Sequence, residues 1–483
     1  MRLPLLGAAL GLALAGCSGS GAATEPASAQ PDTTAMVSMP APERPPMRAP
    51  TPAAPAFSVP VDYYTLDNGL KVVLSVDRSA PTASVAVYYN IGFRIEPRER
   101  TGFAHLFEHM MFQGSENLGK NEFIGLVQRN GGILNGSTRF DFTNYFEIVP
   151  AHTLETMLWA EADRMRGLDV TEENLTNQQG VVSNEVRVNV INQPYGGFPW
   201  LDLPQLANEN WYNAHNFYGE LSDLEAATLE DVQDFFDTYY APNNAALVVV
   251  GDIDVDQTKA WIEQYFGGIE AADVPPIPDL SEPEQTAEKR STKVDSLAQR
   301  PALAWAYHAP ERLSELHVGL AVLDQILLQG NDSRLHQRLV QEAGVTSGVT
   351  GGVNWPLGNL LNYNGPMLYS AWLIHDAETA PDSILAMIDE EIARIVEEGV
   401  TEADVARAKV KLKSALYDTI GGSYGIGRAD LLATFALFDD DPDLINRIVP
   451  MIEDVTAETV HRAARETLRP ENRSIITLTT PGS

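Results

Sequence analysis

Five consecutive residues, His105-Leu106-Phe107-Glu108-His109, carry the strongest chemical signal in the sequence. In a helix with about 3.6 residues per turn, positions four apart share a face, so both imidazoles point the same way and Glu108 stands beside them. Two neutral imidazoles suit a tetrahedral zinc ion that takes a third protein ligand and keeps one position open for water. A carboxylate next to this water that does not bind the metal can accept its proton. The pattern therefore predicts a zinc site with Glu108 as general base.

The segments around this motif alternate between helical and strand patterns. A hairpin is expected over 63–75, around the turn Asp67-Asn68-Gly69, and a second hairpin joins 133–138 to 143–149. Further strands are expected at 82–89 and 245–250, and helices at 102–112, 121–129, 152–166, 172–189 and 229–239. This mixture predicts the α+β class.

The residues after 272 form a linker and then a second half that echoes the first. Residues 273–298 combine prolines and charges with few large apolar side chains, which is typical of a linker. The strand pattern 302–308 is similar to 82–89, and the helix pattern 315–328, closed by Gln329-Gly330, is similar to the helix closed by Gln113-Gly114. We therefore predict two similar halves, 58–272 and 299–483, that arose by internal duplication.

The first residues predict export and lipid attachment. Residues 1–16 combine Arg2 with an apolar stretch shorter than the roughly 20 residues that span a bilayer, as in a signal peptide. The sequence Leu14-Ala15-Gly16-Cys17 resembles the lipobox of bacterial lipoproteins, and Cys17 is the only cysteine. Residues 17–57 are rich in Ala and Pro and predict a disordered tether. With Ser18, this indicates a lipid anchor at Cys17 in the bacterial outer membrane, facing the periplasm; the alternative is an ordinary signal peptide.

Composition limits the partners. The chain has 483 residues, 44% of them hydrophobic, which suits a globular protein of two domains. Its net charge of -33 would repel phosphates, so we expect no nucleic-acid partner. The acidic surface could attract basic or neutral peptides, or could reflect a salty habitat, and charge alone does not separate these.

The motif and its surroundings resemble the pitrilysin/insulinase family of HxxEH zinc metallopeptidases, in particular the branch of bacterial and mitochondrial processing peptidases. The resemblance extends from Val59 to Ser483 and includes the run 239–244 before an apolar strand. It implies two α/β halves, each a sheet covered by helices, and a zinc endopeptidase that acts on peptides. It also implies one zinc per chain, bound by His105, His109 and a glutamate 76 positions after His109, which is Glu185.

The resemblance implies two further sets of residues around the metal. Family members usually carry a second glutamate seven residues before the ligand, and this chain has Gln178 there. A glutamine carbonyl can accept the imidazole N–H without the carboxylate charge, so zinc affinity should be modestly weaker. The strand 133–138 resembles the edge strand that binds peptide, with Asn135 and Gly136 nearest the scissile bond; the alternative is an ordinary hairpin.

One departure from the family concerns the C-terminal half. Many active members carry there an arginine and a tyrosine, seven apart, that reach the substrate, and this chain has Val340 and Ser347. This implies the zinc subunit of a heterodimer whose partner lacks HxxEH and supplies the pair. The alternatives are a homodimer, the use of Tyr363 or Tyr369 after an insertion, or a non-catalytic zinc-binding subunit, although such subunits typically lose the motif.

Overall fold

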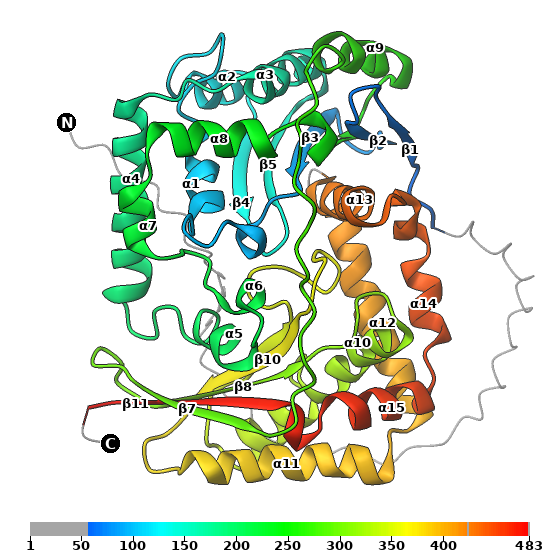
Figure 1. Ribbon diagram of the computed structural model, residues 1–483. Helices are drawn as coiled ribbons and strands as arrows, with labels where there is room; N and C mark the ends of the chain where they lie inside the picture. Colours follow the sequence, from blue (N-terminus) through cyan, green and yellow to red (C-terminus); the bar gives the residue numbers. More distant parts are fainter. Residues whose placement is uncertain (1–56, 423–424, 482–483) are drawn as a thin grey trace, which may run out of the picture. The chain divides into compact units, whose positions relative to one another are not determined.

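The computed structural model describes residues 57–422 and 425–481 (Figure 1). The expected signal peptide, Cys17 and all but the last residue of the expected tether lie outside these ranges. Within them, no helix combines the length and the apolar character that a membrane span requires.

The first half contains a six-stranded sheet in the order β1-β2-β6-β3-β5-β4. Its strands are β1 (Asp62–Thr65), β2 (Lys71–Val76), β3 (Thr82–Tyr89), β4 (Ile133–Thr138), β5 (Thr143–Pro150) and β6 (Ala245–Gly251). Both predicted hairpins are present, and the turn between β1 and β2 depends on Gly69, whose φ is +90°. Because β4 pairs only with β5 among the described strands, its outer edge has no strand partner.

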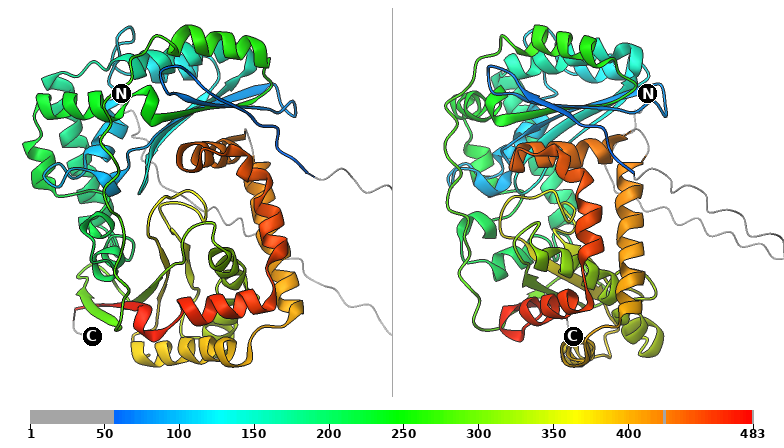
Figure 2. Two further views of the ribbon diagram at one scale, coloured as in Figure 1. Left: turned by 45° about the vertical axis from the view of Figure 1, so that its right-hand side comes forward. Right: turned by 90° about the vertical axis from the view of Figure 1, so that its right-hand side faces the viewer.

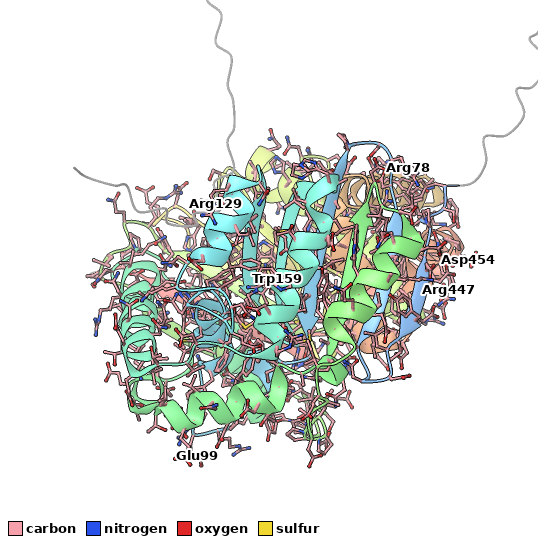
Figure 3. All side chains as sticks on the ribbon, turned by 90° about the horizontal axis from the view of Figure 1, so that it is seen from above. Arg78, Glu99, Arg129, Trp159, Arg447 and Asp454 are labelled. Carbon is pink, nitrogen blue, oxygen red and sulfur yellow. The ribbon has the colours of Figure 1, made fainter. Side chains whose placement is uncertain are left out.

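Helices cover one face of this sheet. They include α1 (Phe103–Met110), α2 (Glu122–Arg129), α3 (Leu154–Arg166), α4 (Glu172–Val186), α8 (Leu229–Tyr239) and α9 (Val255–Phe266). Seen from above, the helix layer lies over the sheet, with Arg129 at the end of α2 and Trp159 on α3 (Figure 3). Alternate residues of β3, such as Val85 and Val87, pack into this layer, while Ala86 and Tyr88 face the other side. Both faces are thus buried.

The second half repeats this arrangement. Its five strands are β7 (Lys289–Val294), β8 (Ala302–His308), β9 (Thr350–Val353), β10 (Leu368–Ile374) and β11 (Arg473–Thr479), in the order β7-β11-β8-β10-β9. Each sheet contains one parallel pair, β2–β6 or β7–β11, followed across the sheet by three antiparallel pairs. Strands at equivalent positions of the two sheets also occur in the same order along each half. Helices α10 (Glu315–Leu327), α11 (Pro381–Glu398), α12 (Glu402–Ile420), α14 (Ile448–Asp454) and α15 (Ala457–Thr467) complete this half. The matching topology supports the predicted duplication.

The predicted linker is partly wrong, because residues 289–294 form β7. This strand lies at the edge of the second sheet, and most of its side chains are polar and at least partly exposed. An exposed edge strand carries charges and lacks the apolar alternation of a core strand, so its composition is that of a linker.

Each half also covers the sheet of the other. Helix α5 (Asp202–Ala207), from the first half, places Leu203 and Ala207 against Ala302 and Ala304 of the second sheet. Helix α13 (Ile426–Asp439), from the second half, packs on β2, β3 and β6 of the first sheet (Figure 2). Each sheet is thus partly covered by a helix from the other half of the chain, the first by α13 and the second by α5.

Candidate metal centre

Helix α1 is held at its N-terminus by a buried carboxylate. Glu96 accepts hydrogen bonds from the backbone N–H of Gly102, at 2.9 Å, and of Ala104, at 2.6 Å. Burial raises the pKa of Glu96 to about 8, despite these two hydrogen bonds. Gly102 has φ +83°, and a Cβ there would lie 2.6 Å from the carbonyl oxygen of Tyr218. The start of the helix is therefore fixed against the loop that contains Tyr218.

The structure brings His105, His109 and Glu185 together. The Nε2 atoms of His105 and His109 lie 3.7 and 3.5 Å from Glu185 Oε2. These three residues form the one candidate cluster of metal-ligating side chains within the described ranges. A tetrahedral zinc ion with bonds of about 2.0–2.1 Å separates its ligand atoms by about 3.4 Å. The donor set and its spacing therefore fit zinc.

The protonation of these side chains also suits a cation. Burial, together with the neighbouring His109, lowers the pKa of His105 to about 3, so its imidazole is neutral. Burial opposes ionisation of both Glu185 and His109, but their mutual hydrogen bond prevails: the pKa of Glu185 is lowered and that of His109 is raised. Protons on His109 would compete with a metal ion, and therefore binding should weaken as the pH falls.

Glu108 stands beside this cluster and does not belong to it. Its Oε2 accepts a hydrogen bond of 2.8 Å from the Thr138 hydroxyl, which fixes the carboxylate and leaves Oε1 for another partner. Burial raises the pKa of Glu108 above its usual value. A fixed carboxylate with a raised pKa can accept a proton and later release it, as a general base requires.

The other predicted site residues lie around this centre. Gln178 is buried on α4, where its side chain donates to Asn177 Oδ1 at 2.8 Å and helps to raise the pKa of the His109 imidazole. Asn135 and Gly136 lie on the edge strand β4, where Asn135 is exposed. A Cβ at Gly136 would approach the Cγ of Glu108 to 3.3 Å. Gly136 thus faces the predicted general base from β4, as does Thr138 two residues further along the strand.

Sequence analysis missed Tyr218, which contacts two of the predicted ligands. Its hydroxyl donates to Glu185 Oε1 at 3.4 Å, and its ring centroid is 5.3 Å from that of His105. The hydroxyl thereby occupies one carboxylate oxygen and leaves Oε2 facing both histidines. Tyr218 lies in the loop between α6 (Trp211–Ala214) and α7 (Leu221–Ala226), where no helical spacing relates it to the motif.

Two tyrosines considered as substitutes for the missing pair are buried in the second half. The hydroxyl of Tyr363 lies 2.9 Å from His317 Nε2, and that of Tyr369 donates to Asp324 at 3.0 Å. Their exposed fractions are 1% and 3%. In this arrangement neither hydroxyl is available to a substrate.

Comparison with known proteins places this fold and site in one family. Residues 71–195 match the model of Insulinase (Peptidase family M16), and residues 226–412 match that of the Peptidase M16 inactive domain. With an HxxEH helix facing a glutamate in one of two similar halves, the fold and the site define a zinc-protease-like protein. The chain belongs to the pitrilysin/insulinase family, peptidase family M16.

The chain is similar to relatives from bacteria and mitochondria. It is 26% identical over 388 residues to the zinc protease PqqE of Helicobacter pylori, covering 78% of this chain and 84% of that protein. It is 24% identical to a probable mitochondrial-processing peptidase subunit beta of Arabidopsis thaliana, covering 83% and 75%. The crystal structure of a protease from Helicobacter pylori superposes with a TM-score of 0.80 at 24% identity, covering 87% of this chain and all of that one. This likeness confirms the predicted fold.

Proposed function

We propose that this chain is a zinc-dependent endopeptidase that hydrolyses peptides or unfolded protein segments. The observation that carries the proposal is the convergence of two Nε2 atoms on one oxygen of Glu185, at 3.7 and 3.5 Å, with Glu108 beside them. The centre thus offers three candidate ligands for the metal and, as a separate residue, one candidate base. Hydrolysis by an activated water requires both.

The side chains of this centre support a division of labour. A zinc ion bound there would lower the pKa of a water molecule and polarise the scissile carbonyl. Glu108 Oε1 accepts the proton of the attacking water while the Thr138 hydroxyl holds Oε2. The protonated Glu108 then donates to the leaving amine. The free edge of β4 pairs with the backbone of an extended peptide next to Gly136, which gives affinity with little dependence on sequence.

We further propose that the chain acts as one subunit of a two-subunit enzyme. Val340 and Ser347 occupy the positions where the arginine and tyrosine are expected, and Tyr363 and Tyr369 are buried. The zinc ion and the general base would activate the attacking water. The peptide must also be held where this water can reach its scissile carbonyl. A related subunit without HxxEH, or a second copy of this chain, would supply that clamp.

The chain alone should therefore cleave a library of unstructured peptides slowly, and a related subunit that carries the arginine and tyrosine should accelerate it. A misplacement of about 1 Å can cost on the order of a hundredfold in rate, so we expect a gain of that size on titration. The rate is measured with zinc-loaded protein and again after chelation. The control is the same subunit with its arginine and tyrosine replaced by alanine.

Two results would contradict these proposals separately. Full turnover by the chain in its monomeric state, unchanged by the partner, would refute the two-subunit arrangement, whereas full turnover by a homodimer would assign the clamp to a second copy of this chain. An intact library in the presence of zinc, partner and chain together would refute the peptidase function.

We propose that the protein is attached to the bacterial cell envelope through Cys17 and faces the periplasm. The proposal is supported by the sequence Leu14-Ala15-Gly16-Cys17 and by the lack of any other cysteine. The wild-type protein should fractionate with membranes and carry diacylated Cys17, and Cys17→Ser should release it into the soluble fraction. A Cys17→Ser protein that still sediments with membranes would speak against the lipid anchor.

A further inference from the structure

Arg139 is a partly buried cation at the end of the edge strand β4. It follows Thr138, whose hydroxyl holds the carboxylate of Glu108 at 2.8 Å. Its backbone is fixed on both sides of the Cα atom: the N–H donates to Phe142 O at 2.8 Å, and the carbonyl accepts from the N–H of Phe93 at 3.1 Å. The arginine therefore starts from a defined place beside the metal centre.

The side chain of Arg139 makes no hydrogen bond and no ion pair with any residue in the described ranges. Carboxylates are not scarce, because the chain has 66 acidic residues and 33 basic ones. A charged side chain that is removed from water without an anionic partner loses free energy. The five N–H donors of the guanidinium are thus available to a ligand.

The charge of Arg139 acts on carboxyl groups from both halves. Burial raises the pKa of Glu108 on α1, and the positive charge of Arg139 is among the influences that oppose this increase. Burial also raises the pKa of Asp430 on α13, again against the charge of Arg139. Asp430 forms no ion pair with the arginine and instead accepts hydrogen bonds from Tyr88 and Asn359, both at 3.0 Å. The guanidinium is therefore within electrostatic range of two carboxyl groups and bound to neither.

A peptide paired with the free edge of β4 would pass this cation. Gly136 and Thr138 face Glu108, and Arg139 lies three residues after Gly136. Residues of an extended chain are spaced about 3.3 Å apart, so a peptide residue level with Arg139 is about 10 Å from the residue level with Gly136. A carboxylate at this position can accept two parallel hydrogen bonds from the guanidinium, whereas a neutral amide oxygen forms a weaker bond.

We infer that Arg139 is a specificity-determining residue that binds a carboxylate of the substrate two to four residues from the scissile bond. The inference rests on the proposed peptidase function and adds a substrate class to it, namely peptides with an acidic side chain or a C-terminal carboxylate at that distance. This contact is separate from the clamp on the scissile bond that we propose for a second subunit.

The test measures binding without turnover. Zinc-loaded, full-length Glu108→Gln protein is titrated with fluorescent, unstructured Ala/Gly peptides that carry one central Glu or one central Gln and an amidated C-terminus. A third peptide has the Gln and a free C-terminus, and so separates the two sources of the carboxylate. We expect a carboxylate to tighten binding by about tenfold, at the lower end of what a hydrogen bond to a charged group contributes. The wild type should cleave the preferred peptide two to four residues from its carboxylate, as mapped by mass spectrometry.

Three substitutions, each made in the Glu108→Gln protein, assign this preference. Arg139→Gln should remove it and leave both zinc content and the affinity for the amidated Gln peptide unchanged. Arg139→Lys keeps the charge without the planar fork and should retain only part of the preference. Arg78→Gln is the matched control, because it removes the same charge from an exposed side chain between β2 and β3, away from β4 (Figure 3). It should leave the preference unchanged.

Equal binding of all three peptides would overturn the inference, as would a carboxylate preference that survives in Arg139→Gln. A full preference in Arg139→Gln and Arg139→Lys alike would assign it to another cation. If the preference depends on Arg139 but the wild type cleaves none of the peptides, the binding role of Arg139 stands and the proposed peptidase function fails.

Discussion

Replacing Glu108 by glutamine should abolish peptide cleavage and leave zinc bound. The amide keeps the size of the side chain and can still contact the Thr138 hydroxyl, but it cannot accept the proton of the attacking water. General base catalysis contributes about a hundredfold to ten-thousandfold, so kcat should fall by at least that range. Zinc content is measured by metal analysis, and cleavage is measured with the same peptide library.

Glu99→Gln is the control for this experiment, because Glu99 is exposed on the surface (Figure 3). It makes the same chemical change away from the centre and should alter neither cleavage nor zinc content. If Glu108→Gln kept most of its activity, another group would have to be the base. If it lost zinc, Glu108 would be a ligand and the division of roles would be wrong.

Replacing Glu185 by glutamine should remove both zinc and activity. Its carboxylate provides the oxygen on which both imidazoles converge and the one negative charge among the three candidate ligands. Loss of a residue that only supports a ligand lowers metal affinity by about 10–100-fold. Loss of a ligand charge should exceed that range, as measured by competition with a chelator of known affinity.

Tyr218→Phe provides a graded comparison for Glu185→Gln. It removes only the hydroxyl that contacts Glu185 Oε1 and keeps the ring against His105. Its zinc affinity should fall by about tenfold, at the lower end of the range for residues that orient a ligand. If Glu185→Gln bound zinc as tightly as the wild type, the third ligand would have to be sought elsewhere. If Tyr218→Phe bound zinc as tightly as the wild type, the role of Tyr218 would be limited to packing its ring against His105.

The sequence was sufficient for the local parts of this centre. The spacing of His105 and His109 places both rings on one face of any helix, and the structure has that helix at α1. The core strands β3 and β6 were predicted to within one residue, because runs of β-branched and aromatic residues distinguish buried strands. The positions of Glu185 and Gln178 came from family resemblance, since a glutamate or glutamine in a helix is usually a solvated residue.

The parts that escaped prediction depend on tertiary contacts. Tyr218 reaches Glu185 from a loop whose course is set by the close approach of Gly102 to the carbonyl of Tyr218. Neither helical nor strand periodicity in the sequence indicates such a close approach between two loops. The edge strand β7 was assigned to a linker because its side chains are exposed. The exchange of α5 and α13 could not be anticipated, because the apolar face of a helix does not specify which sheet it will cover.

This exchange has a consequence for the ancestry of the molecule. A chain ending after the first half would lack α13 and expose the apolar face that includes Ala86, Val248 and Val250, whereas α5 would have no sheet to cover. Two copies of such a half-length chain could cover each other's sheets only with α5, exchanged about a twofold axis. The present interior thus resembles the interface of a domain-swapped dimer, with both partners in one polypeptide. Selection on either half then acts on both, because a substitution in α5 or α13 alters the core of the half that did not encode it.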